Sequence, residues 1–419
     1  MRRAALLAAL LLAGCGGREE EQRRDPRPAA SPAEGRARGG DPERHVEALQ
    51  RIADRSGGTR AAGTPGDRAT VDYVARALRA AGWRVRLRPV RFPYFQERSP
   101  PRVAGLQPRR EVRTAQYSGS GRVRARVRQV ARHGCTPGDY AALRRGEIAL
   151  ADRGTCFFNV KARLAQRAGA AALVVNDVQG ETPVSASLLR PGVRIPVVLV
   201  TDRAARRLVD RVVSVRVDAV SERRRTTNVV AETAEPRDRW VMAGGHHDSV
   251  TAGPGINDNG SGVAALLAVA ERLPDRPGLR LGFWGAEELA LYGSRAYVRA
   301  LSREERDAIS AYLNFDMLAS PNGRLAVYDR DDRLERVLRA AIAGDEREVG
   351  LGGASDHAPF ERAGIPVGGI FAGAAGRGRR HGPADRCYHR SCDTLDNLDL
   401  RLLRRSTDAV EIALRRLAR

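Results

Sequence analysis

The segment Trp240-Val-Met-Ala-Gly-Gly-His-His-Asp248 indicates the fold class, because an apolar run ends abruptly in glycines and polar side chains. Such a run is typical of a strand buried on both faces of a parallel sheet. Helical stretches such as residues 263–273 separate it from similar apolar runs, which are residues 228–231, 279–284, 311–315 and 365–371. This alternation predicts an α/β fold with a mostly parallel sheet that helices cover on both faces.

Acidic and imidazole side chains gather where these strands end and in the turn-prone loops beside them. They are His246, Asp248, Asp258, Glu287, Glu288, Asp316 and His389. Because ligands collect outside the carboxyl ends of the strands in an open α/β sheet, we expect these side chains to meet at one edge. Imidazole and carboxylate together suit zinc, and five such ligands can hold two zinc ions if one carboxylate bridges them.

The motifs that carry these residues resemble the M28 family of cocatalytic zinc aminopeptidases. In chain order they are His246-x-Asp248, Gly255-x-Asn-Asp258-Asn-x-Ser-Gly262, Glu287-Glu288, Asn314-x-Asp316 and Tyr388-His389. The resemblance covers residues 41–107 and 222–419, and Cys387-Tyr-His-x-x-Cys392-Asp is similar to the secreted actinobacterial members. It implies a sheet of the zinc-peptidase type and hydrolysis of the N-terminal peptide bond of peptides that have a free N-terminus.

The same resemblance implies a role for each motif residue. One zinc would be held by His246, Asp316 and Asp258, and the other by Glu288, His389 and the same bridging Asp258. Glu287 would be the general base for a metal-bridging water, and Tyr388 would donate a hydrogen bond to the oxyanion. Asp248 would accept a hydrogen bond from the far nitrogen of His246. The Asp258–Asn259 peptide bond would be cis.

Residues 108–221 have a different character, with short β-rich runs around an alanine-rich helix at residues 160–170. Gly134-Cys135 and Arg153-Gly-Thr-Cys156-Phe-Phe158, followed by Lys161 and Ala168-Gly-Ala170, resemble a protease-associated (PA) domain. M28 peptidases often carry such a domain as an insertion. The PA resemblance implies a Cys135–Cys156 disulfide. If Cys15 carries a lipid, as the N-terminal segment described next suggests, four of the five cysteines remain, and an even number in an exported protein indicates paired thiols. We therefore also predict a Cys387–Cys392 disulfide.

The first fifteen residues resemble a bacterial lipoprotein signal peptide. Met1-Arg-Arg3 is basic, residues 4–13 are apolar, and Leu12-Ala-Gly-Cys15 matches a lipobox. We expect cleavage before Cys15 and a lipid on its sulfur; an ordinary signal peptide with a chance cysteine is the alternative. Residues 16–40 are polar and rich in Pro and Gly, which predicts a disordered tether. The protein would then be an exported lipoprotein, anchored to the membrane at the cell surface or released outside the cell.

The net charge of +22 comes almost entirely from arginine, because Lys161 is the sole lysine. The arginines are interspersed with acidic residues and form no block or aromatic platform, so we expect no nucleic-acid partner.

Two other functions remain open: a glutaminyl-cyclase-like enzyme with one zinc, and a non-catalytic lipoprotein that binds peptides. No Gly-x-Ser-x-Gly or His-Glu-x-x-His motif supports a serine hydrolase or a helix-borne zinc site. His357, in Ser355-Asp356-His357, is expected to be structural or to line the pocket. The remaining histidines are expected at the surface or in loops: His45, His133, His247 and His381.

Overall fold

The computed structural model describes residues 40–131, 133–235, 237–342, 347–350, 352–373 and 385–418. The expected signal peptide with Cys15, nearly all of the tether, and His381 lie outside these residues. Within these ranges, no helix is both long enough and apolar enough to cross a membrane.

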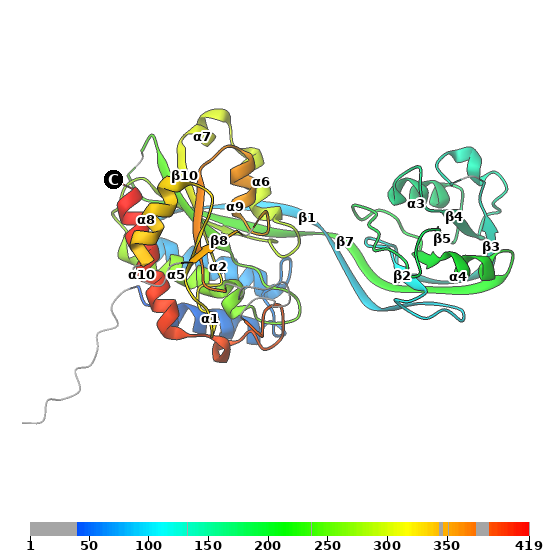
Figure 1. Ribbon diagram of the computed structural model, residues 1–419, viewed down its shortest axis with the longest axis horizontal. Coiled ribbons are helices and arrows are strands. Elements are labelled where there is room, and N and C mark those ends of the chain that lie inside the picture. The colour runs from blue at the N-terminus through cyan, green and yellow to red at the C-terminus, as the bar shows by residue number, and fades with distance from the viewer. Residues whose placement is uncertain are drawn as a thin grey trace, which may run out of the picture. The chain divides into compact units, whose positions relative to one another are not determined.

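The helices and strands follow one another as drawn in Figure 1. The helices are α1 (Pro42–Asp54), α2 (Pro65–Ala80), α3 (Phe158–Arg167), α4 (Asp202–Leu208), α5 (Gly262–Arg272), α6 (Tyr292–Ala300), α7 (Arg303–Asp307), α8 (Asp332–Ile342), α9 (His357–Arg362) and α10 (Leu400–Leu417), with short turns η1 (Pro137–Tyr140), η2 (Ile256–Ser261) and η3 (Leu395–Asn397). The strands are β1 (Arg84–Val103), β2 (Val112–Thr114), β3 (Gly121–Gln129), β4 (Ile148–Asp152), β5 (Ala172–Asp177), β6 (Val197–Thr201), β7 (Val212–Glu232), β8 (Trp240–His246), β9 (Leu279–Trp284), β10 (Ile309–Asp316), β11 (Ala326–Tyr328), β12 (Arg347–Val349) and β13 (Val367–Phe371).

The strands form one 13-stranded sheet in the order β12-β11-β13-β10-β8-β9-β7-β3-β4-β5-β6-β2, with β1 also paired to β7. Strands β9, β8, β10 and β13 are parallel neighbours, as are β3, β4, β5 and β6. The long antiparallel strands β1 and β7 join these two parallel groups. The predicted α/β class with a mostly parallel sheet is therefore confirmed.

Alternate residues of the central strands pack against helices on opposite faces of the sheet. From β10, Leu313 belongs to the core that contains α1, α2, α5, α8 and α10, whereas Tyr312 belongs to the smaller cluster that contains α6 and α9. In β8, Ala243 and Met242 divide in the same way. Figure 1 shows helices on both sides of these strands. Burial on both faces explains why the strands are continuous apolar runs.

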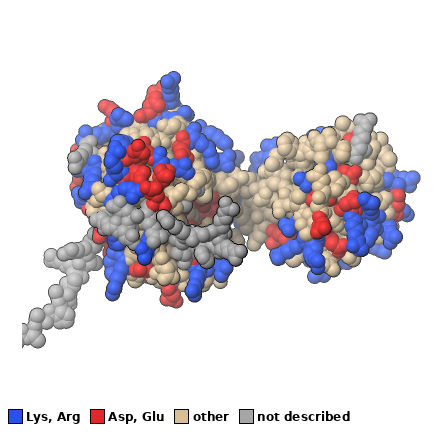
Figure 2. All heavy atoms as spheres, in the orientation of Figure 1, with Lys and Arg blue, Asp and Glu red and all other residues tan. Residues whose placement is uncertain are grey.

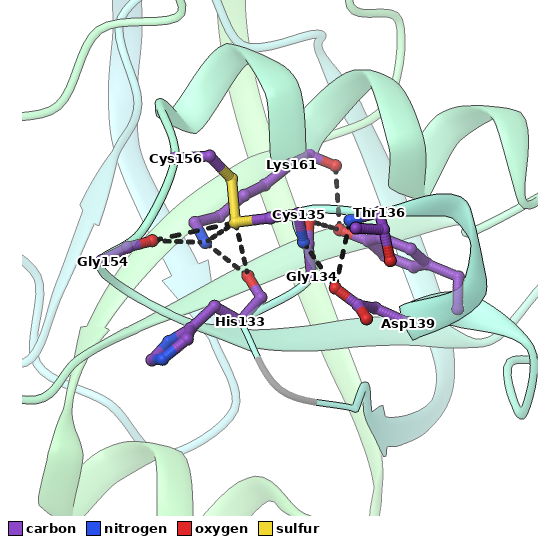
Figure 3. Close-up of a disulfide and its surroundings, with 9 residues drawn as sticks. His133, Gly134, Cys135, Thr136, Asp139, Gly154, Cys156 and Lys161 are labelled. Atoms are coloured by element: carbon purple, nitrogen blue, oxygen red, sulfur yellow. Dashed lines mark hydrogen bonds between the residues drawn. A yellow bond between two sulfur atoms is a disulfide. The ribbon is translucent and has the colours of Figure 1, made fainter.

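A second core lies around the other parallel group and draws its residues from Val103 to Ala219. Cys135 and Cys156 are joined there by a disulfide (Figure 3). Lys161 is fully buried beside it and donates hydrogen bonds to the carbonyls of His133 and Gly154, the latter at 3.0 Å. These contacts connect the two loops that the disulfide also links.

One strand is much longer than the sequence predicted. The apolar run at residues 228–231 predicted a short strand, but β7 begins at Val212 and pairs with β1, which runs from Arg84 to Val103. Residues 93–102 of β1 and 221–227 of β7 are mostly polar, with prolines in β1, and carry no apolar run, whereas residues 212–220 of β7 have buried apolar side chains at alternate positions. Two register shifts between Glu97 and Arg102 accommodate the prolines that lie between these residues in β1.

On the face shown in Figure 2, basic and acidic side chains are interspersed.

Candidate active site

Three parallel strands bring their carboxyl ends together at the site. In register, His246 at the end of β8 lies beside Trp284 of β9, and Gly244 lies beside Asn314 of β10. Gly245 allows this close approach, because a Cβ atom there would lie 2.6 Å from the carbonyl oxygen of Phe315. The residues that follow each strand therefore meet at one edge of the sheet.

Asp258 lies at the centre of the cluster, between two histidines. Its Oδ1 is 3.2 Å from Nε2 of His246, and its Oδ2 is 3.2 Å from Nε2 of His389. A further carboxylate accompanies each histidine: Asp316 Oδ1 lies 3.5 Å from His246 Nε2, and Glu288 Oε2 lies 3.0 Å from His389 Nε2. The structure thus contains two His-carboxylate groups that share Asp258. The Asp258–Asn259 peptide bond is cis, as the resemblance implied.

Glu287 lies beside these groups, with Oε2 3.9 Å from His246 Nε2. Its backbone N–H donates to Oδ1 of Asp248 at 3.1 Å. Nδ1 of His246 lies 3.1 Å from the backbone carbonyl of Asp248 and 3.8 Å from its carboxylate. The main chain of Asp248, rather than the expected carboxylate, is therefore the near partner of His246, while the carboxylate positions the backbone of Glu287.

Burial dominates the ionisation of these acids. It raises the pKa of Glu287 well above its usual value, and burial together with the Asp258 charge raises the pKa of Glu288 to about 7. Burial would also raise the pKa of Asp258, but hydrogen bonds with His246 and His389 lower it instead. Hydrogen bonds with Asp258 and Glu288 raise the pKa of His389 to about 10. Such a group of buried carboxylates is stabilised by positive charge placed between them.

The donor set fits zinc. Ligand atoms of His246, Asp258 and Glu288 all lie within 4.8 Å of one another. Oε1 of Glu288 and Oδ1 of Asp316 are buried and have no hydrogen-bond partner among the described residues, so both can accept a cation. The other oxygen of Asp316 accepts a hydrogen bond from Ser355 at 2.8 Å, which leaves Oδ1 to face the cluster. Imidazole nitrogen and carboxylate oxygen are the ligands of catalytic zinc sites.

A disulfide-closed loop delivers the last residues of the site. Cys387 and Cys392 are joined, and the rings of Tyr388 and His389 between them stack at 3.8 Å. Asp393, immediately after the loop, was quoted in the sequence motif without a role. Its carboxylate accepts hydrogen bonds from the backbone N–H groups of Asn257, at 2.8 Å, and Asp258, at 3.0 Å. Asp393 therefore connects the His389 loop to the bridging carboxylate.

Ser355, Asp356 and His357 do not form a catalytic triad. Asp356 accepts a hydrogen bond from Ser294, and His357 Nε2 lies 2.9 Å from the carbonyl of Gly352. All three side chains are buried, and Ser355 supports Asp316 as described above. His357 is thus structural, in line with expectation.

The expected surface or loop position was wrong for His45, which is buried in α1. His247 lies in the loop after β8, as expected, and is also buried. His247 Nε2 lies 3.0 Å from Oδ1 of Asp67, and His45 Nδ1 lies 2.6 Å from the hydroxyl of Tyr73. Asp67 is distant from His247 in the sequence, and Tyr73 lies on α2 whereas His45 lies on α1, so neither pairing was predictable from the sequence alone.

A cavity of about 740 Å³ opens over the cluster. Its lining includes every expected metal ligand, Glu287 and Tyr388, together with the apolar side chains of Leu291, Met317, Val349 and Phe371. This volume lies within the ~300–1,000 Å³ of ordinary ligand pockets. The cavity therefore offers an apolar space beside polar, acidic groups.

Comparison with known proteins agrees with this geometry. Residues 228–413 match peptidase family M28, and residues 123–208 match the PA domain. The chain is 38% identical over 401 residues to the probable lipoprotein aminopeptidase LpqL of Mycobacterium tuberculosis, covering 85% of this chain and 80% of that protein. The aminopeptidase from Aneurinibacillus sp. strain AM-1 superposes with a TM-score of 0.63 at 26% identity, covering 90% of this chain and 93% of that chain.

A glutaminyl cyclase from an Acidobacteriales bacterium shares the fold. The TM-score is 0.50 at 15% identity, covering 93% of this chain and 98% of that chain. Identity this low shows a common fold only.

Proposed function

Because the chain belongs to peptidase family M28 and is a zinc-dependent aminopeptidase, we propose that it binds two zinc ions and removes the N-terminal residue from peptides. The ligands would be those that the motifs imply: His246, Asp316 and the bridging Asp258 for one ion, and Glu288, His389 and the same Asp258 for the other.

The observation that carries this proposal is the position of Asp258. Each of its two oxygens faces a different histidine at 3.2 Å, and each histidine has its own second carboxylate. A carboxylate that bridges two cations needs one oxygen for each, which this arrangement supplies. A single ion would leave one of the two groups without a cation.

Zinc at this position would supply a Lewis acid for the scissile carbonyl and a more acidic water. Glu287 would take the proton of that water, because its carboxylate lies against the cluster without being one of the paired ligands. Tyr388 lines the same cavity and would donate a hydrogen bond to the oxyanion. Carboxylates near the metals would hold the free amine of the substrate.

We further propose that residues 108–221 act as an inserted domain outside the chemistry, and that a lipid on Cys15 anchors the protein. The first idea is supported by the separate core, and the second by the lipoprotein name of the M. tuberculosis relative.

A panel of aminoacyl-4-nitroanilides, assayed before and after chelation, tests the activity. We expect hydrolysis of substrates with a free amine, no hydrolysis of their N-acetylated forms, loss of activity with a chelator and recovery with zinc. Elemental analysis should give two zinc ions per chain. One zinc per chain with formation of pyroglutamate from N-terminal glutamine would favour the cyclase, and zinc-loaded protein without any turnover would favour a binding protein.

A further inference from the structure

Two arginines line the active-site cavity together with the acidic cluster. Arg295 comes from α6 and Arg362 is the last residue of α9. They are the cavity's only arginines within the part of the chain that the structure describes. The proposed zinc chemistry uses neither side chain, because a guanidinium is permanently charged and cannot bind a metal ion or accept a proton.

Among the residues that the structure describes, these arginines use little of their hydrogen-bonding capacity. Nη1 of Arg295 has one long contact, 3.4 Å to the carbonyl of Ala290, and Arg362 makes no hydrogen bond or ion pair with any described residue. The acidic residues of the lining face the two imidazoles instead. Each guanidinium has five N–H donors in a planar fork, so each of these arginines can bind a planar anion that enters the cavity.

Packing fixes the two helices that carry the arginines. The rings of Tyr297 in α6 and Phe360 in α9 lie 6.0 Å apart and share a cluster with Trp284, the last residue of β9. Gly353 leaves room for Arg362, because a Cβ atom there would lie 3.1 Å from its Nη2. The arginines thus belong to a wall that is braced against the strand preceding Glu287.

From this distribution of charge we propose that Arg295 and Arg362 form a subsite for a carboxylate of the substrate, so that the enzyme prefers peptides that carry a carboxylate besides their free amine. The inference rests on the proposed function and extends it to a class of substrate. The acidic cluster attracts the ammonium group, and the guanidinium groups bind the carboxylate through charge-assisted, bidentate hydrogen bonds. The carboxylate is either the C-terminus of a short peptide or an acidic side chain.

Three matched pairs of peptides separate these sources. Leu-Ala and Leu-Ala-amide differ only in the C-terminal charge, Leu-Glu-amide and Leu-Gln-amide in the second side chain, and Glu-Ala-amide and Gln-Ala-amide in the first. We expect kcat/KM for the charged member of at least one pair to exceed that of its neutral partner by about tenfold or more, as for a hydrogen bond to a charged group. The pair that shows the preference identifies the carboxylate.

Arg295→Gln and Arg362→Gln should each reduce that ratio, and the double variant should bring it close to one. The matched control is Arg299→Gln, which changes an exposed arginine of the same helix that does not line the cavity; it should keep the wild-type ratio. Equal rates within all three pairs in the wild type, or a ratio that survives the double variant, would overturn the subsite and leave two solvated arginines.

Failure of the subsite and failure of the proposed function give different results. If the neutral amides are hydrolysed without any preference, only the subsite is wrong. If no peptide is hydrolysed, the peptides stay intact with the wild-type protein, and titration calorimetry with the same pairs still tests the subsite. Tighter binding of a charged member, lost in the double arginine variant, would support the subsite, and equal binding would reject it.

Discussion

Replacing Glu287 with glutamine removes a charge while keeping nearly the same shape, and the structure indicates what should survive. The backbone N–H of residue 287 can still donate to Asp248, and neither of the two groups that share Asp258 loses a member. Both zinc ions should therefore stay bound. The rate should nevertheless fall by ~10²–10⁴, the usual contribution of a positioned general base, which corresponds to about 3–5 kcal/mol of activation free energy.

Glu288→Gln is the matched control, because it makes the same chemical change at the next residue. Glu288 lies 3.0 Å from His389, and its buried Oε1 has no hydrogen-bond partner in the described part of the chain, so its loss should lower zinc occupancy and make activity depend on added zinc. Zinc content by elemental analysis, measured alongside kcat, separates the two roles. Near-normal kcat in Glu287→Gln, or loss of zinc from that variant rather than from Glu288→Gln, would refute the assignment.

Three further changes test other parts of the structure. Asp393→Asn should weaken zinc binding and lower the Tm, because each carboxylate oxygen of Asp393 accepts from one backbone N–H and asparagine keeps only one of these two acceptors; a hydrogen bond to a charged group is worth about 1.5–3 kcal/mol. The exposed Asp396→Asn is the control, and equal effects on zinc affinity would argue against a positioning role. Replacing residues 98–218 with an Asn-Gly turn should preserve hydrolysis of aminoacyl-nitroanilides, since Glu97 and Ala219 are already paired across β1 and β7. If the shortened protein folds and binds zinc but is inactive, residues 98–218 must contribute to the active site. Cys15→Ser should release the protein from membranes or leave it unprocessed, as fractionation with mass spectrometry would show, whereas normal processing and membrane partition would exclude the lipobox.

The central sheet and the acidic cluster were predictable because their signals are local. An apolar run such as that of β8 indicates a buried strand by itself, and the residues after it belong to short motifs with fixed spacing. The features that were missed depend on distant partners. Burial of His247 follows from its contact with Asp67, and the polar lengths of β1 and β7 are strands only because they pair with each other. Asp393 was visible in its motif, but its partners are supplied by the fold.

The Cys387–Cys392 bond also has a consequence for when the enzyme becomes active. Thiols stay reduced in the cytoplasm and pair in oxidising surroundings outside it. This bond closes the loop that carries Tyr388 and His389, so a newly made chain would lack that constraint on its last ligand until it left the cell interior. Oxidation would then act as a maturation step that spares cytoplasmic peptides from degradation. Zinc-loaded protein assayed with Cys387–Cys392 reduced and alkylated should be far less active than the oxidised form, and equal activity would rule this step out.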